Sequence, residues 1–302
     1  MRYLKYSEFY ITNVCNQNCT GCNRYNNYAF KGHYLWEDHK EEYIKWSKLV
    51  DIKLIGILGG EPLGNPDFLN WLHGIAELWP NADITIVTNG TYFDQWPNLY
   101  EELSQYGNRI LIEVSHHTPG SWIQSIESHP KIFKQLKSLT PTRNTIDPKN
   151  SAFYRLTYTD KSGMRLWLTS EWFFGDSALI RNELTNELTL HDSDPDEAAD
   201  ICAFHNAGCH HFIAGKLYKC GPVGLLPTFT KQFKVTVTEK QQQLINDYKP
   251  AEADWPEEDL TQFIDNLNNK VVIPQCSLCP SKEVSVKFSA STKKIKIEAV
   301  CE

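Results

Sequence analysis

The first half of the chain alternates short apolar runs with longer amphipathic stretches. Apolar runs of strand length are at residues 9–14, 53–58, 83–88 and 109–115. Stretches in which apolar residues recur every third or fourth position are at residues 37–50, 65–79 and 98–106. The first pattern is typical of buried strands and the second of amphipathic helices. Because the two patterns alternate, the sequence predicts an α/β fold with parallel strands joined by right-handed crossovers.

Turn and capping residues refine these bounds. Asn65 is expected to cap the helix over 65–79, with Pro66 in its first position. One more helix and two more strands are expected at residues 122–139, 153–159 and 164–169. The polar residues 160–163 between the two strands predict a turn.

Three cysteines follow the first predicted strand. Cys15, Cys19 and Cys22 are spaced Cys-x3-Cys-x2-Cys. Three soft ligands that lie close together hold three irons of a [4Fe-4S] cluster and leave the fourth iron without a protein ligand. A zinc site and chance thiols are the alternatives, but zinc prefers four ligands, usually with Cys-x2-Cys pairs. The spacing therefore favours a reactive iron-sulfur site.

This cysteine triad resembles the signature of the radical S-adenosylmethionine (SAM) superfamily. A second motif, Gly59-Gly60-Glu61-Pro62, follows the second predicted strand and resembles the family motif that holds the amino group of SAM. Glycines permit close backbone approach, and a carboxylate pairs with an ammonium group. The resemblance implies a partial (β/α)6-type barrel with its chemistry at the carboxyl ends of the strands.

The same resemblance implies further SAM contacts at strand ends. Thr88 and Asn89 end the third predicted strand, and Ser115 ends the fourth. These residue types are also ordinary in turns, so their role is open at this stage.

One position departs from the family pattern. Relatives often have an aromatic residue just before the third cysteine, where it packs on the adenine of SAM, and here that residue is Gly21. Tyr25 or Tyr28 is the candidate replacement.

A second set of cysteines lies in the C-terminal third. Cys202 and Cys220 flank residues 211–218, which predict a tight hairpin with Gly215 in its turn. A Cys-x2-Cys pair follows at Cys276 and Cys279. This combination resembles the twitch or SPASM extension that follows the barrel in part of the superfamily.

The resemblance implies an auxiliary [4Fe-4S] cluster held by Cys202, Cys220, Cys276 and Cys279. Five cysteines precede the terminal one in this region, which favours one auxiliary cluster over two. Cys209 is an alternative ligand. A structural zinc at the same four thiols remains the other interpretation. The implied domains are a barrel over 1–195 and a small α+β cysteine-rich domain over 196–302; Cys301 is expected to be a bystander or a flexible thiol.

Composition narrows the class of protein. The chain has 302 residues, enough for one large or two modest domains, and a formal net charge of -7. It contains no basic tract, so a nucleic-acid substrate is not expected. It also contains no apolar stretch long enough to cross a membrane and no signal sequence, so a cytoplasmic protein is expected. In that setting its nine cysteines indicate metal ligands rather than disulfides.

The resemblance implies an enzyme that reductively cleaves SAM to a 5′-deoxyadenosyl radical, which takes a hydrogen atom from the substrate. We expect a peptide or protein substrate that is oxidised, cross-linked or epimerised. The alternatives are oxidation or rearrangement of a small molecule, such as an amino-sugar alcohol or a nucleotide, and a non-enzymatic iron-sulfur or zinc protein. An external one-electron reductant such as flavodoxin or ferredoxin is also implied.

Overall fold

A central mixed sheet organises the fold. The computed structural model describes residues 1–19, 21–116, 140–146, 154–170, 173–174, 178–282, 286–287, 290–291 and 294–300. Within them the sheet has nine strands in the order β13-β12-β1-β3-β4-β5-β8-β7-β6. The strands are β1 (Arg2–Tyr10), β3 (Val50–Leu58), β4 (Asp83–Thr88), β5 (Ile110–His116), β6 (Thr140–Ile146), β7 (Tyr154–Thr159), β8 (Arg165–Ser170), β12 (His210–Ile213) and β13 (Lys216–Tyr218).

The middle of this sheet is parallel. Strands β12, β1, β3, β4, β5 and β8 are parallel neighbours, whereas β13, β7 and β6 pair antiparallel at the two ends. The expected α/β fold with a mostly parallel sheet is therefore confirmed. The carboxyl ends of the parallel strands meet at one edge of the sheet, which is where the motif residues lie.

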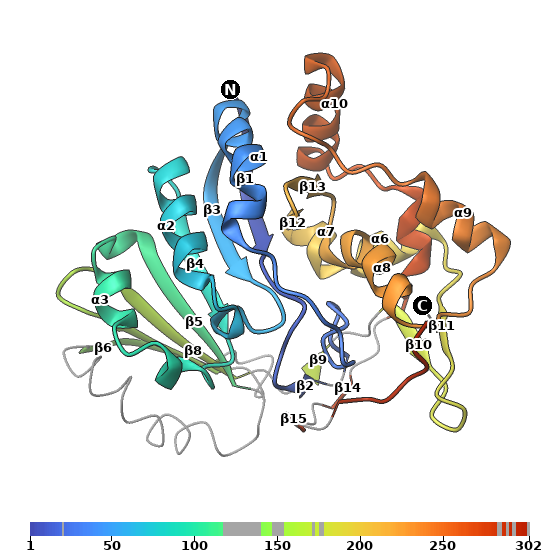
Figure 1. Cartoon of the computed structure of the whole chain (residues 1–302), viewed down its shortest axis with the longest axis horizontal. Coiled ribbons are helices and arrows are strands. Elements are labelled where there is room, and N and C mark those ends of the chain that lie inside the picture. Colours follow the sequence, from blue (N-terminus) through green and yellow to red (C-terminus); the bar gives the residue numbers. More distant parts are fainter. Residues whose placement is uncertain are drawn as a thin grey trace.

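Helices α1 (Trp36–Leu49), α2 (Phe68–Leu78) and α3 (Leu99–Ser104) connect the first strands and lie together along one side of the sheet (Figure 1). Short 3-10 turns η1 (Pro62–Gly64), η2 (Phe93–Gln95) and η3 (Gly107–Arg109) complete the connections. The helices bury aromatic side chains. Trp36 stacks on Tyr43 with ring centroids 5.8 Å apart, and Trp71 meets Trp36 edge-on at 5.2 Å. These contacts fix the helices against the sheet.

The predicted start of α2 is wrong by two residues. Asp67, not Asn65, precedes its first residue, Phe68. The Asn65 side chain instead accepts a hydrogen bond from the backbone N–H of Asp67 at 2.9 Å and donates to the carbonyls of Ile11 and Tyr34. Asn65 therefore stabilises the turn before the helix rather than capping the helix, because its side-chain amide also binds two other segments of the chain.

The C-terminal part contributes a helical layer beside β12 and β13 (Figure 1). Its elements are β10 (Leu179–Arg181), β11 (Leu188–Leu190), α6 (Pro195–Ile201), α7 (Ala203–Ala207), α8 (Gly221–Gln232), α9 (Glu239–Asp247), α10 (Glu257–Asn268) and η4 (Pro274–Leu278). The predicted hairpin is confirmed: Ala214 and Gly215 join β12 to β13 with φ angles of 48° and 77°. Since β12 pairs with β1, this hairpin extends the main sheet, and the division at residues 195 and 196 stays a prediction.

Two short pairings bring distant segments together. β2 (Asn18–Cys19) pairs with β15 (Ala290–Ser291), and β9 (Phe173–Phe174) pairs with β14 (Val286–Lys287). The predicted helix over 122–139 and Cys301 lie outside the described residues.

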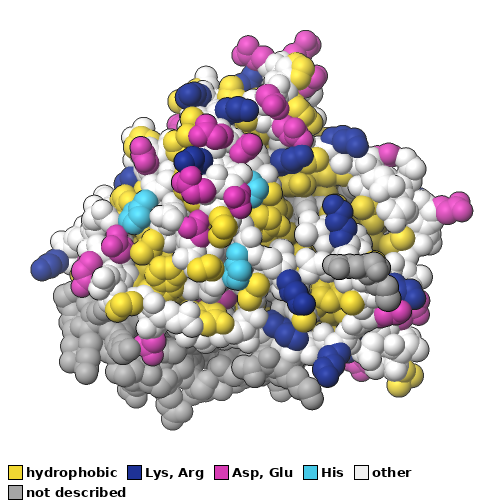
Figure 2. Space-filling view, viewed as in Figure 1, with side chains coloured by type: hydrophobic (Ala, Val, Ile, Leu, Met, Phe, Trp, Pro, Cys, Tyr) yellow, Lys and Arg dark blue, Asp and Glu magenta, His cyan; other side chains and the backbone are white. Residues whose placement is uncertain are grey.

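The surface carries both signs of charge. On the face in Figure 2, acidic and basic side chains are interspersed over the upper part of the molecule. Within the described ranges, no helix combines the length and the apolar composition that crossing a membrane requires.

Candidate active site and a second cysteine cluster

The three cysteines of the first motif line one cavity. Cys15, Cys19 and Cys22 lie on the loop after β1, are partly exposed and carry free thiols. The cavity has a volume of about 340 Å³, within the usual range for small-molecule sites. Its lining residues are Tyr6, Glu8, Cys15, Gln17, Cys19, Cys22, Asn23, Arg24, Asn26, Leu58, Gly59, Gly60, Glu61, Val87, Thr88, Asn89, Glu113 and Ser115.

Burial keeps two of these thiols, Cys15 and Cys19, protonated when no metal is bound. It raises the pKa of Cys15 to about 11 and also raises the pKa of Cys19, whose increase the neighbouring Cys22 and Cys15 reinforce. A soft metal centre would displace the protons, because thiolates are the metal ligands. Since three thiols face one cavity and none is used in a disulfide, the donor set fits a cluster with one open iron position.

The two glycines after β3 let the chain lie against the start of the cysteine loop. A Cβ on Gly60 would be 2.2 Å from the carbonyl oxygen of Val14, and one on Gly59 would be 2.6 Å from that of Thr12. The backbone N–H of Gly60 donates to Thr12 at 2.7 Å. The N–H of Glu61 donates to Val14 at 2.8 Å. The close approach expected of the glycines is therefore made, in this structure, to the chain's own backbone.

Glu61 is almost fully buried, with 1% of its surface exposed. Its carboxylate accepts hydrogen bonds from Thr88 Oγ1 at 2.5 Å and from the N–H of Asn89 at 2.7 Å, and a longer one from the N–H of Leu63 at 3.2 Å. Burial raises the pKa of Glu61 to about 7, although these hydrogen bonds act in the opposite direction. The carboxyl group thus changes charge near neutral pH while it faces the cavity.

The other predicted SAM contacts are distributed around the same cavity. Thr88, Asn89 and Ser115 line it, at the carboxyl ends of β4 and β5. Asn89 also reaches the cysteine loop, because its Nδ2 atom donates to Asn16 Oδ1 at 3.0 Å. Pro62 is buried at the start of η1 and is not among the lining residues. Their binding roles stay predictions.

Gly21 adopts a backbone conformation that suits glycine. Its φ angle is 72°, in the left-handed region that glycine adopts without strain, and Tyr25 in the same loop also has a left-handed φ angle, 62°. The two candidate replacements point elsewhere. The rings of Tyr25 and Tyr28 pack on Phe229 of α8, at centroid distances of 5.1 Å and 5.3 Å, and neither residue lines the cavity.

A group of charged residues that no sequence motif indicated also lines the cavity. Glu8 of β1 accepts hydrogen bonds from Tyr6 at 2.8 Å and from Arg24 at 2.5 Å, and its carboxylate lies 2.6 Å from Nε2 of His211. Burial alone would raise the pKa of Glu8, but Arg24 and His211 hold it well below its usual range. Glu8 therefore stays ionised.

Cys209 belongs to this group rather than to the other C-terminal cysteines. Its sulfur lies within 4.8 Å of ligand atoms of Glu8 and His211. Burial raises its pKa well above the usual value. A period-two alternation of Tyr6 and Glu8 along the first strand is the sequence signal that could have indicated these two residues, whereas Arg24, Cys209 and His211 come from other segments and share no local pattern with them.

The structure brings the second cysteine set together. Cys202, Cys220, Cys276 and Cys279 line a cavity of about 30 Å³, and Cys209 is not among its lining residues. The other lining residues are mostly apolar or basic: Ala198, Phe204, His205, His210, Lys219, Val223, Leu267 and Lys270. The four thiols come from the end of α6, the start of α8 and the turn η4.

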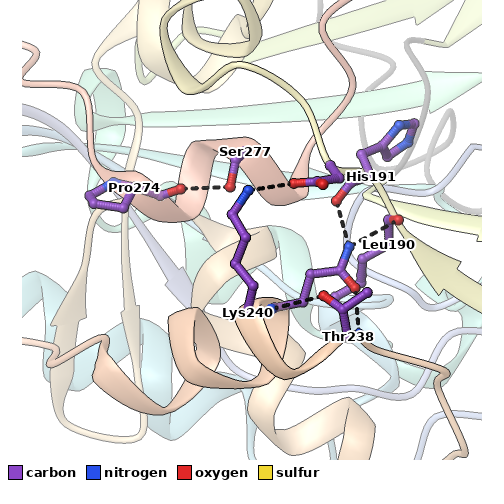
Figure 3. A network of polar contacts seen from close by, with 8 residues as sticks. Leu190, His191, Thr238, Lys240, Pro274 and Ser277 are labelled. Atoms are coloured by element: carbon purple, nitrogen blue, oxygen red, sulfur yellow. Dashed lines mark hydrogen bonds and ion pairs between the residues drawn. The ribbon is translucent and has the colours of Figure 1, made fainter.

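Polar contacts hold the segment that leads into α6 beside both η4 and α9, and Figure 3 shows the contacts with α9. The N–H of Ser193 donates to the carbonyl of Ser277 at 2.9 Å. Gln241 of α9 donates to the carbonyl of His191 at 2.9 Å, and Lys240 forms an ion pair with Asp192 at 2.8 Å. The four cysteines are therefore positioned by contacts between segments that are far apart in sequence.

The donor set of this second site fits a closed soft-metal centre. Burial raises the pKa of Cys220 to about 12, and it raises the pKa of Cys279, where the other three thiols add to the effect. Four neighbouring thiols do not stay ionised together without a cation, so a metal centre would bind with loss of their protons. Both tetrahedral zinc and a [4Fe-4S] cluster accept four thiolates.

Comparison with known proteins gives a partial match. Residues 9–134 match the family model described as "Radical SAM superfamily". A probable GTP 3′,8-cyclase of Methanocaldococcus jannaschii is 31% identical over 110 residues, which are 36% of this chain and 36% of that protein. The chain thus matches about a third of the length of this curated relative. These matches indicate an enzyme that contains a radical SAM domain.

Solved structures give weaker likenesses. Streptococcus suis SuiB bound to S-adenosylmethionine is 22% identical with a TM-score of 0.33, over 40% of this chain and 27% of that one. SuiB bound to the precursor peptide SuiA is 16% identical with a TM-score of 0.29, over 45% of this chain and 38% of that one. Both TM-scores are too low to indicate a shared function.

Proposed function

We propose that this chain, which carries a radical SAM superfamily domain over residues 9–134, binds a [4Fe-4S] cluster and SAM in the cavity at the strand ends. The observation that carries the proposal is the convergence of Cys15, Cys19, Cys22 and Glu61 on one cavity. When bound, the cluster supplies the electron that cleaves SAM to methionine and a 5′-deoxyadenosyl radical, which abstracts a hydrogen atom from the substrate.

The protein's part is to bind, orient and exclude water. The three thiols hold the cluster and leave one iron open. Glu61 pairs with the SAM ammonium group, with Thr88 and Asn89 holding its carboxylate in place. Ser115 lines the same cavity from β5 and would contact another part of SAM.

The second site holds one auxiliary [4Fe-4S] cluster in this proposal. Cys202, Cys220, Cys276 and Cys279 supply four thiolates, which leave no open iron. Such a centre serves electron transfer to or from the substrate rather than binding it. A structural zinc is the competing occupant of the same thiols.

The charges around the cavity favour a peptide or protein substrate. Its lining includes three carboxylates, those of Glu8, Glu61 and Glu113, and one guanidinium, that of Arg24, which is already paired with Glu8. Glu8 is offset by Arg24 and Glu61 is assigned to SAM, so the remaining balance is mildly negative, which suits a substrate with neutral or cationic groups better than a polyphosphate. Oxidation, cross-linking or epimerisation of a residue is the reaction class proposed, with flavodoxin or ferredoxin as the external reductant.

A small-molecule substrate is the second candidate. The observation that favours it is the similarity to a protein named as a probable GTP 3′,8-cyclase, which extends over 110 residues.

Anaerobic reconstitution tests the reaction class. The purified chain is loaded with iron and sulfide, reduced and given SAM, and 5′-deoxyadenosine is measured. Two clusters correspond to about eight irons per chain. About four irons with one zinc contradicts the auxiliary cluster. Failure to bind or cleave SAM contradicts the enzyme and favours a non-enzymatic metal protein.

Isotope transfer tests the substrate class. A fully deuterated peptide pool and a fully deuterated nucleotide pool are incubated separately with the active enzyme. Deuterium in 5′-deoxyadenosine from the peptide pool alone supports the first candidate. Deuterium from the nucleotide pool alone contradicts a peptide substrate and supports a small-molecule substrate.

A further inference from the structure

The C-terminal segment crosses the cysteine loop of the first site. We call its described residues, 290–291 and 294–300, the C-terminal strap. In the strap, β15 pairs antiparallel with β2, so that Ala290 lies opposite Cys19. Farther along, the N–H of Ile295 donates to the carbonyl of Asn27 at 3.1 Å. The strap is the dark red segment that runs from β15 toward the C-terminus in Figure 1.

The strap is anchored independently of the loop. The N–H of Lys234 donates to the carbonyl of Glu298 at 3.0 Å. The N–H of Val300 donates to the carbonyl of Gln232 at 3.1 Å. These contacts fix the strap to the end of α8, so the loop is held against a separately supported segment.

Lys294 is the strap residue that enters the loop. Its ammonium group donates to the carbonyls of Gln17 and Asn26. Gln17 lies between the first two cysteines, and Asn26 lies just after the third. Because lysine has three donors on one flexible stem, a single ammonium group clamps both ends of the loop.

Lys294 lies near enough to the three thiols for their charges to act on it. Burial lowers the pKa of Lys294, while Cys15, Cys22 and Cys19 act to raise it. Among the described residues, no ion pair joins Lys294 to a carboxylate. A half-buried ammonium group without an anionic partner is costly, and an anionic group bound by the three thiolates would compensate it.

We propose that Lys294 is a positioning residue of the three-cysteine site, which clamps the loop and places a positive charge beside the bound cluster so that the cluster is easier to reduce. This inference rests on the proposed function, because it requires a cluster at these thiols. A cluster with thiolate ligands becomes more negative on reduction, so a nearby cation favours the reduced form, and net charge is one of the factors that set cluster potentials.

Three variants test the inference. Lys294→Met removes the charge, Lys294→Arg retains it, and Lys296→Met removes an exposed lysine two residues along the same strap. Each protein is reconstituted, its iron is counted, and its reduction is followed by electron paramagnetic resonance at controlled potentials. The signal that changes on addition of SAM identifies the cluster concerned.

At the potential that half-reduces the wild-type cluster, the reduced fraction should fall about fivefold or more in Lys294→Met. It should remain near the wild-type value in Lys294→Arg and Lys296→Met. If Lys294→Met instead loses about half its iron while the other two variants keep theirs, the charge is needed for assembly, which supports the positioning role, and the potential of the fraction that does assemble decides the effect on reduction.

Two results overturn the inference. One is an unchanged potential and iron content in Lys294→Met. The other is equal loss of iron in Lys294→Met and Lys294→Arg, which shows that charge is not what matters. A wild-type chain that binds no SAM-responsive cluster is a separate failure, because it rejects the proposed function before any variant is compared.

Discussion

The two cysteine sites of this protein differ in how they are built. The first places three cysteines on one loop of eight residues and opens onto a polar cavity of about 340 Å³. The second gathers four cysteines from separate segments around a cavity of about 30 Å³ with mostly apolar and basic walls. The open site has room for a reacting molecule, whereas the closed site has none.

The difference also concerns what each site contributes to the fold. The first loop carries all three donors within eight residues, and the neighbouring strands and the C-terminal strap hold it in place. The second site exists only when α6, α8 and η4 have come together, so binding a metal there would contribute directly to folding. Loss of the first site should therefore remove activity, and loss of the second should remove stability.

The largest expected effect is on SAM cleavage. Replacing Cys15, Cys19 and Cys22 together with Ala should reduce 5′-deoxyadenosine formation to the level without enzyme and lower the iron content from about eight to about four per chain. The visible absorbance of the remaining cluster and the unfolding temperature should change little. A triple variant that still forms 5′-deoxyadenosine at the wild-type rate would show that these three cysteines do not hold the cluster that cleaves SAM.

The second effect is on stability. Cys276→Ala or Cys279→Ala should lower the free energy of unfolding by on the order of 3 kcal/mol and remove about four irons, because the metal that joins distant segments is lost. Cleavage of SAM should continue in both variants. Chemical denaturation under anaerobic conditions measures the loss.

Cys209→Ala is the matched control for these variants, because Cys209 is a buried thiol of the same region that lies outside the four-cysteine cavity. Its iron content should equal that of the wild type. Equal loss of iron in the control would move Cys209 into the ligand set.

The third effect compares how tightly the backbone is packed near the two sites, measured as the stability lost when a glycine is replaced by alanine. Gly60→Ala places a methyl group 2.2 Å from the carbonyl oxygen of Val14, where the neighbour is backbone and gives way poorly. The free energy of unfolding should fall by about 3 kcal/mol, with partial loss of iron.

Gly208→Ala, near the second site, is the control for this variant. A Cβ at Gly208 would meet no atom within 4 Å, and the φ angle of Gly208 is 62°. The substitution should cost only about 1 kcal/mol from backbone strain. Equal costs would show that Gly60 matters only for its conformation.

The smallest effect is on affinity. Glu61→Gln removes the charge that pairs with the SAM ammonium group and should weaken SAM binding by about 1–3 kcal/mol without changing the iron content. The pKa of Glu61 is about 7, so in the wild type SAM binding should weaken as the pH falls through neutrality and the carboxylate is protonated. Calorimetry at several pH values should show this slope in the wild type and a flat response in the variant. A slope that persists in the variant would assign the titration to another group.

The sequence predicted the elements whose local pattern is strong. Strand β4 has the predicted bounds, Asp83–Thr88, because a run of buried residues ends at Asn89-Gly90. Helix α1 was predicted to within one residue at each end. Strand β1 was expected at 9–14 but covers Arg2–Tyr10, because its polar first residues are fixed by contacts made only in the folded chain.

The same distinction applies to the site. Cys15, Cys19, Cys22 and Glu61 belong to short motifs, so spacing alone indicated a common site. Lys294 contacts residues 268 and 277 positions away, and no local pattern sets it apart from the lysines beside it. Pairings of this kind depend on the tertiary fold and were not available to sequence reasoning.

The parallel pairing of β12 with β1 has a consequence for shortened forms of the protein. β12 covers β1 from Ser7 to Tyr10, and α10 covers its beginning, where Asn268 donates to the carbonyl of Tyr3 at 3.0 Å. Without these two elements β1 would be a long exposed edge strand, which recruits other chains and favours aggregation. Residues 1–195, the predicted first domain, are therefore a poor unit for expression or transplantation, since covering β1 requires residues more than two hundred positions downstream.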